Sequence, residues 1–199
     1  LAYTYGVGPF EPSYAPPPPG TYELPPIQTV SDHAVLDESG HETTLFALAP
    51  QRLTVVAFIY TSCGEAAGCP VSTAVLHRLD RELAADAELR NAVTLITVSF
   101  DPTRDTPARM AAQRSMHGPA GDWRFVTARD EAMLQPLLDD FGQQISRLTH
   151  ADGSATGLFR HVLKVFLVDR GRRVRNVYSG GFLHAELVLN DLRTVLRAR

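Results

Sequence analysis

Cys63 and Cys69 are the only cysteines of the chain, and five residues separate them. Their segment follows a nearly continuous run of β-branched and aromatic residues at 53–60 and precedes a stretch with helical spacing that opens at Pro70. We therefore expect the pair between the carboxyl end of a buried strand and the N-terminus of a helix. Helix N-termini favour thiolates, and glycines in the gap let the two sulfur atoms reach bonding distance. The pair is predicted to exist as a dithiol or as a disulfide.

Two cysteines suit few kinds of site. They cannot form the disulfide framework of a small secreted domain, which uses four or more. A zinc finger is excluded because the chain has no second cysteine pair or neighbouring histidine pair, and c-type haem attachment because CxxCH is missing. An inert buried pair remains the structural alternative. Glu65, inside the loop, is expected to be an exposed solubilising charge, with a weak metal ligand or an acid as the alternative.

Other polar candidates border the predicted strands. His161 directly precedes an apolar run at 162–168, so it is either a partly buried histidine bonded to the backbone or a metal ligand. Asp101 and Asp105 follow another strand end. Asp105 is expected to act as a cap or to pair with Arg104 or Arg109, and secondarily to line a metal crevice.

Two larger groups are expected to be structural. The methionines are predicted to fill the core, with the Met116-His117 step as an alternative remote metal contact; they are Met110, Met116 and Met133. Four arginines at a hairpin turn are expected at a solvated tip, with a docking patch for an acidic partner as the alternative; they are Arg170, Arg172, Arg173 and Arg175.

The elements that must position these residues follow from hydrophobic periodicity and from turn and cap residues. Strands buried on both faces are predicted at 53–60 and 93–100, because apolar residues there are nearly continuous. The remaining elements are a short hairpin within 35–45, helices at 70–87, 106–116, 130–141 and 184–196, and strands at 124–127, 162–168 and 173–178.

Residues 1–26 are predicted to form a Pro-rich extension or linker, with four consecutive prolines at 16–19. Such a run favours an extended polyproline path that could hold the domain away from whatever lies upstream, for example a membrane tether. The alternative is a strap along the domain with Tyr3, Tyr5, Phe10 and Tyr14 packed down.

Residues 27–199 are predicted to form one α/β domain. A parallel βαβ half precedes an antiparallel ββα half, which gives a mixed central sheet with helices on both faces, the layout of a thioredoxin-like fold. The composition, 44% apolar and 21% charged, excludes wholesale disorder. A net charge of −3 without a basic, aromatic-rich cluster excludes a nucleic-acid partner.

The chain resembles the Sco/SenC family. Three stretches carry the resemblance: Phe58 to Cys63 leading to Cys69-Pro70, the SxDPxxDTP pattern from Ser99 to Pro107, and His161 shortly before Val165 to Asp169. The resemblance implies a thioredoxin-like fold and one copper ion, Cu(I) or Cu(II), bound by Cys63, Cys69 and His161. Two thiolates and an imidazole suit copper and also permit zinc. Because the metal needs thiolates, copper loading should depend on the redox state of the pair.

Proteins of this family assemble the dinuclear copper site of cytochrome c oxidase. The resemblance therefore implies a copper metallochaperone whose partner is the copper-bearing subunit of that oxidase or another cuproprotein, together with a thiol-disulfide reductant. It further implies the bacterial periplasm, with a membrane contact only through an anchor upstream of this chain.

Two departures from the family pattern bear on the copper site. The family spacing is CxxxC, whereas this chain has CxxxxxC, a longer loop that could alter copper geometry or favour disulfide chemistry. The family histidine follows an acidic residue and precedes a serine, whereas Arg160 and Val162 flank His161. Any carboxylate that orients the imidazole must then come from elsewhere.

Two other functions use the same residues. One is a thiol-disulfide oxidoreductase that works through Cys63 and Cys69 without a stable copper site. Thioredoxin-type oxidoreductases resemble one another in a cis-proline that precedes the strand opposite the cysteines and shapes the groove for dithiol exchange. No proline follows Pro136 here, so that proline is missing and an imidazole is available instead. The other function is a redox or copper sensor. A peroxiredoxin is disfavoured because the third residue after Thr61 is Gly64 and not cysteine.

Overall fold

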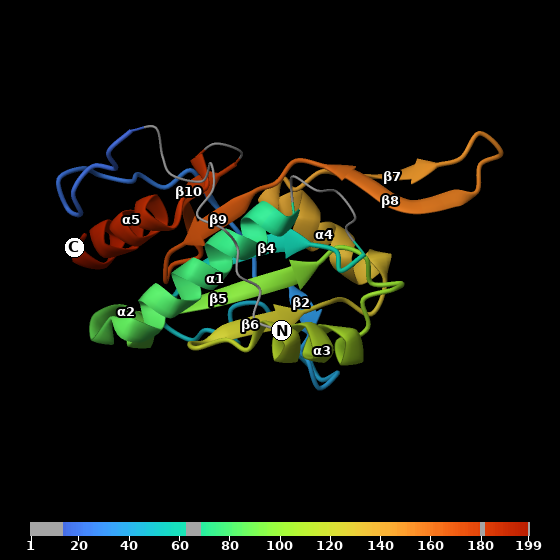
Figure 1. The fold of residues 1–199 in the computed structure, drawn as a ribbon, viewed down its shortest axis with the longest axis horizontal. Coiled ribbons are helices and arrows are strands. Elements are labelled where there is room, and N and C mark those ends of the chain that lie inside the picture. The colour runs from blue at the N-terminus through green and yellow to red at the C-terminus, as the bar shows by residue number, and fades with distance from the viewer. Residues whose placement is uncertain (1–13, 63–68, 180–181, 199) are drawn as a thin grey trace.

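The computed structural model describes residues 14–62, 69–179 and 182–198, whose centre is one sheet with helices on both faces (Figure 1). Six strands lie in the order β1, β10, β9, β4, β5, β6. Their bounds are β1 Gln28–Thr29, β4 Leu53–Ile59, β5 Val93–Ser99, β6 Trp123–Val126, β9 Val165–Val168 and β10 Arg173–Tyr178. The β4, β5 and β6 strands are parallel, whereas β9 runs antiparallel to β4 and β10 antiparallel to β9. The predicted mixed, thioredoxin-like sheet is confirmed.

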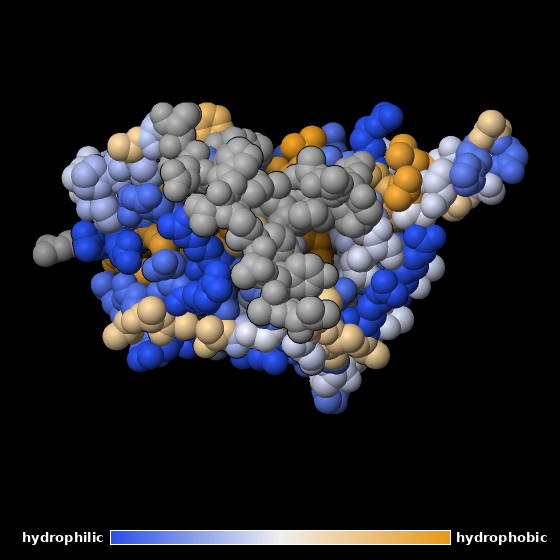
Figure 2. Space-filling model, in the orientation of Figure 1, coloured by the Kyte–Doolittle hydropathy of each residue, from blue (hydrophilic) through white to orange (hydrophobic). Residues whose placement is uncertain are grey.

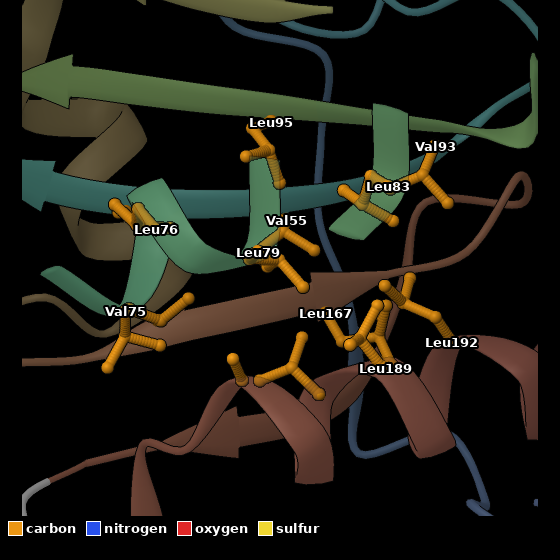
Figure 3. Packing of buried hydrophobic residues seen from close by; sticks show 14 of the residues in the cluster. Val55, Val75, Leu76, Leu79, Leu83, Val93, Leu95, Leu167, Leu189 and Leu192 are labelled. Carbon is orange, nitrogen blue, oxygen red and sulfur yellow. The ribbon is translucent and has the colours of Figure 1, made fainter. Parts of the chain in front are cut away.

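The two central strands are buried on both faces, as their apolar sequences predict. Val55 belongs to a cluster with side chains of α1 (Cys69–Ala85) and α5 (Ala185–Arg197). In Figure 3, Leu79 of α1 lies beside Val55, and Leu189 of α5 lies next to Leu167 of β9 in the same cluster. Val56, the next residue, instead joins the cluster that contains α4 (Glu131–Phe141). Strand alternation thus supplies both cores from one sheet.

Local capping sets the bounds of two predicted helices. Thr106 accepts a hydrogen bond from the Arg109 amide (3.3 Å) and precedes Pro107 at the start of α3 (Pro107–His117). Asp130 caps α4 in the same way, and α4 ends at Gly142, whose φ of 62° suits glycine. The small β2–β3 hairpin (Ala34–Leu36 and Glu42–Thr44) is also confirmed.

The structure corrects two predicted elements and adds one. The helix expected at 70–87 ends at Ala85, because Asp86 caps a separate short helix α2 (Ala87–Ala92). The strand expected at 162–168 is confined to β9. A hairpin that was not predicted, β7 (Ile145–Thr149) and β8 (Ala155–His161), precedes it and projects beyond the sheet (Figure 1).

Methionine burial confirms two of three predictions. Met110 is buried in the core, and Met133 packs partly buried against the α4 side. Met116 was predicted to fill the core, but this prediction is wrong, since its side chain is 53% exposed near the end of α3.

The arginines at the β9–β10 turn are held differently from one another. Arg170 and Arg172 are exposed, as expected of a solvated tip. Arg173 and Arg175 both reach the buried carboxylate of Asp169, at 2.8 and 3.0 Å.

A second group of charged side chains lies at the end of the molecule formed by α2 and α5. Figure 2, in the orientation of Figure 1, shows hydrophilic side chains over this end, and Arg193 of α5 pairs with Asp86 there.

The described part of the N-terminal segment lies along α5. The Gly20 amide donates to Thr194 Oγ1 (2.9 Å), and Asn190 donates to the Pro17 carbonyl (3.1 Å). Tyr22 donates to the buried carboxylate of Asp191. For residues 17–24 these contacts are those of a strap and not of a free tether, whereas Tyr3, Tyr5 and Phe10 lie outside the described residues. Where the structure describes the chain, no helix combines the length and apolar character that a membrane crossing requires.

Two histidines join α1 to α3. His77 Nε2 and His117 Nδ1 lie 2.6 Å apart, and both rings contact Trp123, with centroids at 5.2 and 5.6 Å. Burial lowers the pKa of His77, and burial together with the neighbouring His77 lowers the pKa of His117 to about 4. Near neutral pH the pair is therefore uncharged and shares one N–H.

This pair predicts a loss of stability in mild acid. The pKa values of both histidines are lower in the folded chain than the ordinary value of 6.5. The unfolded chain therefore binds protons first as the pH falls below 6.5, and stability is lost progressively down to about pH 4. We expect a loss on the order of 1–2 kcal/mol after solvent screening. Urea unfolding at pH 7.5 and 4.5 measures it, and the His77→Gln/His117→Gln protein should lack this component; an unchanged difference would contradict the assignment.

Candidate metal centre

The predicted cysteine segment leaves the sheet at the carboxyl ends of β4 and β5. These strands end in register, with Ile59 opposite Ser99, and Tyr60 and Thr61 continue the chain from β4. The backbone of Cys69 begins α1, as predicted. Cys63, Glu65 and the side chain of Cys69 lie outside the described residues. The geometry of the cysteine pair is therefore a prediction from the sequence.

His161 lies at the same end of the sheet. It is the last residue of β8, and its half-buried ring packs against Phe100 (centroids 5.0 Å apart) and Tyr60 (5.9 Å). Phe100 directly follows β5, and Tyr60 stands three residues before Cys63. The hairpin thus carries the imidazole to the point from which the cysteine segment departs.

Asp105 holds this end of the sheet together. Its fully buried carboxylate accepts hydrogen bonds from the Thr61 amide (2.9 Å), the Thr61 hydroxyl and the Ser99 hydroxyl (2.6 Å). Arg109 Nε lies 3.4 Å from the carboxylate and donates to Thr61 Oγ1 at 2.6 Å. The predicted ion pair with Arg109 is confirmed, whereas the cap of α3 is Thr106. Asp105 therefore fixes Thr61, two residues before Cys63.

The Ser99 and Thr61 partners of Asp105 were not identified from the sequence. Ser99 alternates with apolar residues of a predicted strand, and only its place in the SxDPxxDTP pattern distinguishes it. Its hydroxyl also accepts from the Asp101 amide (3.1 Å), so one serine serves both aspartates of that pattern. The pattern is thus a hydrogen-bonded unit that shapes the strand ends.

The same pattern anchors the hairpin that carries His161. Arg104 donates to the Gly157 carbonyl in β8 (2.9 Å), and Arg147 of β7 lies 3.9 Å from the buried carboxylate of Asp101. Burial and the charge of Asp105 raise the pKa of Asp101, while Arg147 and Arg104 oppose that shift. Gly157 has a φ of +77°, and a Cβ there would stand 2.2 Å from Arg104 Nη1, so only glycine permits this approach.

The rim near His161 is partly apolar. Val162 is 61% and Leu158 43% exposed. Hydrophobic side chains surface at the edge where β7 and β8 join the body (Figure 2). Among the residues that the structure describes, no group of three or more His, Cys, Asp or Glu side chains could hold a metal ion. The candidate site lies at the strand ends, where His161 packs beside the start of the cysteine segment.

Comparisons with known proteins identify the family and the fold of this chain. A family model described as SCO1/SenC matches residues 23–197. A copper-bound ScoI structure from Bradyrhizobium japonicum is 24% identical, with a TM-score of 0.66 over 83% of this chain and 98% of that one. A SCO1/SenC family lipoprotein from Bacillus anthracis is 19% identical, with a TM-score of 0.70 over 88% and 100%.

BsSco is a member of the Sco family of cytochrome c oxidase assembly proteins in which a disulfide switch was identified. It is 18% identical, with a TM-score of 0.67 over 89% of this chain and all of that one. No curated protein matches the chain significantly.

Proposed function

Since this chain belongs to the SCO1/SenC family, we propose that it is a copper metallochaperone that carries one copper ion as cargo on Cys63, Cys69 and His161. The observation that carries the proposal is the position of His161, whose ring lies against Tyr60 and Phe100 at the strand ends where the cysteine segment begins. A donor set of two thiolates and one imidazole is soft to borderline and suits Cu(I) and Cu(II).

The redox state of the two cysteines controls whether the protein binds copper. Copper binds thiolates, so the dithiol takes up the ion and the disulfide does not. Loading therefore needs a thiol-disulfide reductant as a second partner. The disulfide switch in BsSco supports such gating in this chain.

The recipient follows from the family. Relatives of this chain are cytochrome c oxidase assembly proteins, so we propose that it delivers copper to the copper-bearing subunit of that oxidase or to another cuproprotein. The exposed Leu158 and Val162 give such a partner an apolar contact near His161. A relative that is a lipoprotein supports association of this chain with a membrane. We propose that this chain acts in the bacterial periplasm.

The test is an anaerobic titration of the reduced protein with Cu(I) against a competing chelator. We expect one copper per chain, and an affinity lower by about 100-fold or more in Cys63→Ser, Cys69→Ser and His161→Ala, because each removes a ligand. His150→Ala is the matched control, since His150 is exposed at the turn of the same hairpin. Equal affinity in His161→Ala and His150→Ala would contradict the proposed ligand set.

The second candidate is a thiol-disulfide oxidoreductase, which the longer CxxxxxC loop favours. The two thiols would give two electrons and two protons to a disulfide of the target, become a disulfide themselves, and be restored by an external dithiol. Catalytic turnover with that dithiol, retained in His161→Ala and lost in Cys63→Ser, would establish this function over copper delivery.

A further inference from the structure

We propose that His77 and His117 form a second cation site, selective for Cu(II), at the junction of α1 and α3. The two nitrogens that face each other, His77 Nε2 and His117 Nδ1, are 2.6 Å apart and belong to different helices. His77 lies eight residues after Cys69, about 12 Å further along the axis of α1. The site is independent of the cysteine pair and of the proposed function.

The separation of the nitrogens fits tetragonal copper better than tetrahedral zinc. With metal–nitrogen bonds of about 2.0 Å, two ligands at a right angle stand about 2.8 Å apart, and two tetrahedral ligands about 3.3 Å. The two nitrogens, 2.6 Å apart in the structure, therefore need to move apart only slightly to bind Cu(II). Both rings must also turn so that their lone pairs point at the ion. Square-planar nitrogen sites are typical of Cu(II), which also binds such ligands more tightly than Zn(II).

The surroundings keep both imidazoles available as neutral ligands. The His117 ring stacks on Phe125 and Trp123, with interplanar angles of 12° and 25°, and both histidines are half-buried. On metal binding, the imidazole that donates the shared N–H moves that proton to its outer nitrogen, so that both facing nitrogens present lone pairs. No net proton is released, and two water molecules from solvent complete the square plane.

Trp123 provides a reporter inside the site, because it is the only tryptophan of the chain and touches both rings. The experiment titrates Cu(II) into the Cys63→Ser/Cys69→Ser protein, in which no thiol can bind or reduce the ion. We expect one equivalent to quench the fluorescence by more than about half, since Cu(II) would lie beside the indole. His77→Gln and His117→Gln should each raise the copper concentration for half-quenching about tenfold or more.

His41→Gln is the control, because His41 is exposed and distant in sequence from the pair, and it should leave the titration unchanged. A half-quenching concentration that is the same in His77→Gln and His41→Gln would overturn the proposal. Electron paramagnetic resonance of the Cu(II)-loaded Cys63→Ser/Cys69→Ser protein gives a second test that needs no histidine variant. Coupling to two imidazole nitrogens supports the site, and coupling to fewer than two overturns it.

Discussion

An Asp105→Ala protein is expected to lose about 3 kcal/mol of stability and most of its copper affinity. The substitution removes a fully buried carboxylate that accepts from the Thr61 amide, the Thr61 hydroxyl and the Ser99 hydroxyl. The buried Ser99 hydroxyl and the partly buried Thr61 donors would lose this acceptor, and Arg109 would lose its carboxylate. Because Thr61 stands two residues before Cys63, the start of the cysteine segment would also lose its fixed position.

Urea unfolding and the copper titration measure the two effects separately. Asp105→Asn keeps one acceptor oxygen and should lose about half as much stability. Asp152→Ala is the control, because Asp152 is exposed and its carboxylate accepts from the amide and the hydroxyl of nearby Ser154 at the turn of the hairpin. Copper affinity of Asp105→Ala equal to that of Asp152→Ala would show that Asp105 stabilises the fold without shaping the site.

An Asp191→Ala protein is expected to lose about 3 kcal/mol of stability and to loosen the strap. The buried carboxylate of Asp191 accepts from Tyr178 (2.7 Å), from Asn176 (2.8 Å) and from Tyr22. Burial and this carboxylate raise the pKa of Tyr22 to about 12, so the phenol stays a donor throughout the neutral range. Removing the acceptor strands the buried Tyr178 hydroxyl and takes away one of the hydrogen bonds that hold residues 17–24, beside those of Gly20 and Pro17.

Tyr22→Phe separates the two parts of this effect, because it removes only the hydrogen bond between Tyr22 and Asp191. We expect it to cost about 1 kcal/mol and to speed proteolytic cleavage within residues 17–24, whereas Asp191→Ala speeds cleavage and also unfolds at markedly lower urea concentration. Identical unfolding midpoints for the two variants would mean that Tyr178 and Asn176 gain nothing from Asp191.

Local signals explain which elements the sequence predicts. The strands β4 and β5 follow from apolar runs, and α3 from Thr106-Pro107 at its start, because those signals lie within the elements themselves. The β7–β8 hairpin escapes such reasoning, since Phe159 is its one fully buried residue and its placement depends on distant partners such as Asp101 and Arg104.

The candidate site likewise contains residues that the sequence singles out and residues that it does not. His161 can be singled out because it precedes an apolar run and fits a family pattern, and the structure places it beside the start of the cysteine segment. The role of Ser99 could not be predicted, because its partner Asp105 becomes a neighbour only once the strand end and the following loop are folded. The ligand set of Cys63, Cys69 and His161 stays a prediction until copper binding is measured.

Contacts between the strap and α5 join parts of the chain that leave the ribosome far apart in time. The Gly20–Thr194 and Asn190–Pro17 hydrogen bonds span 174 and 173 residues, and β1 likewise pairs with the late strand β10. Closing such long loops costs entropy that only the finished partner repays. We therefore expect β4, β5 and their helices to become native first and the strap to dock after α5 is complete. In this domain, residues that are synthesised early are therefore among the last to form their native contacts.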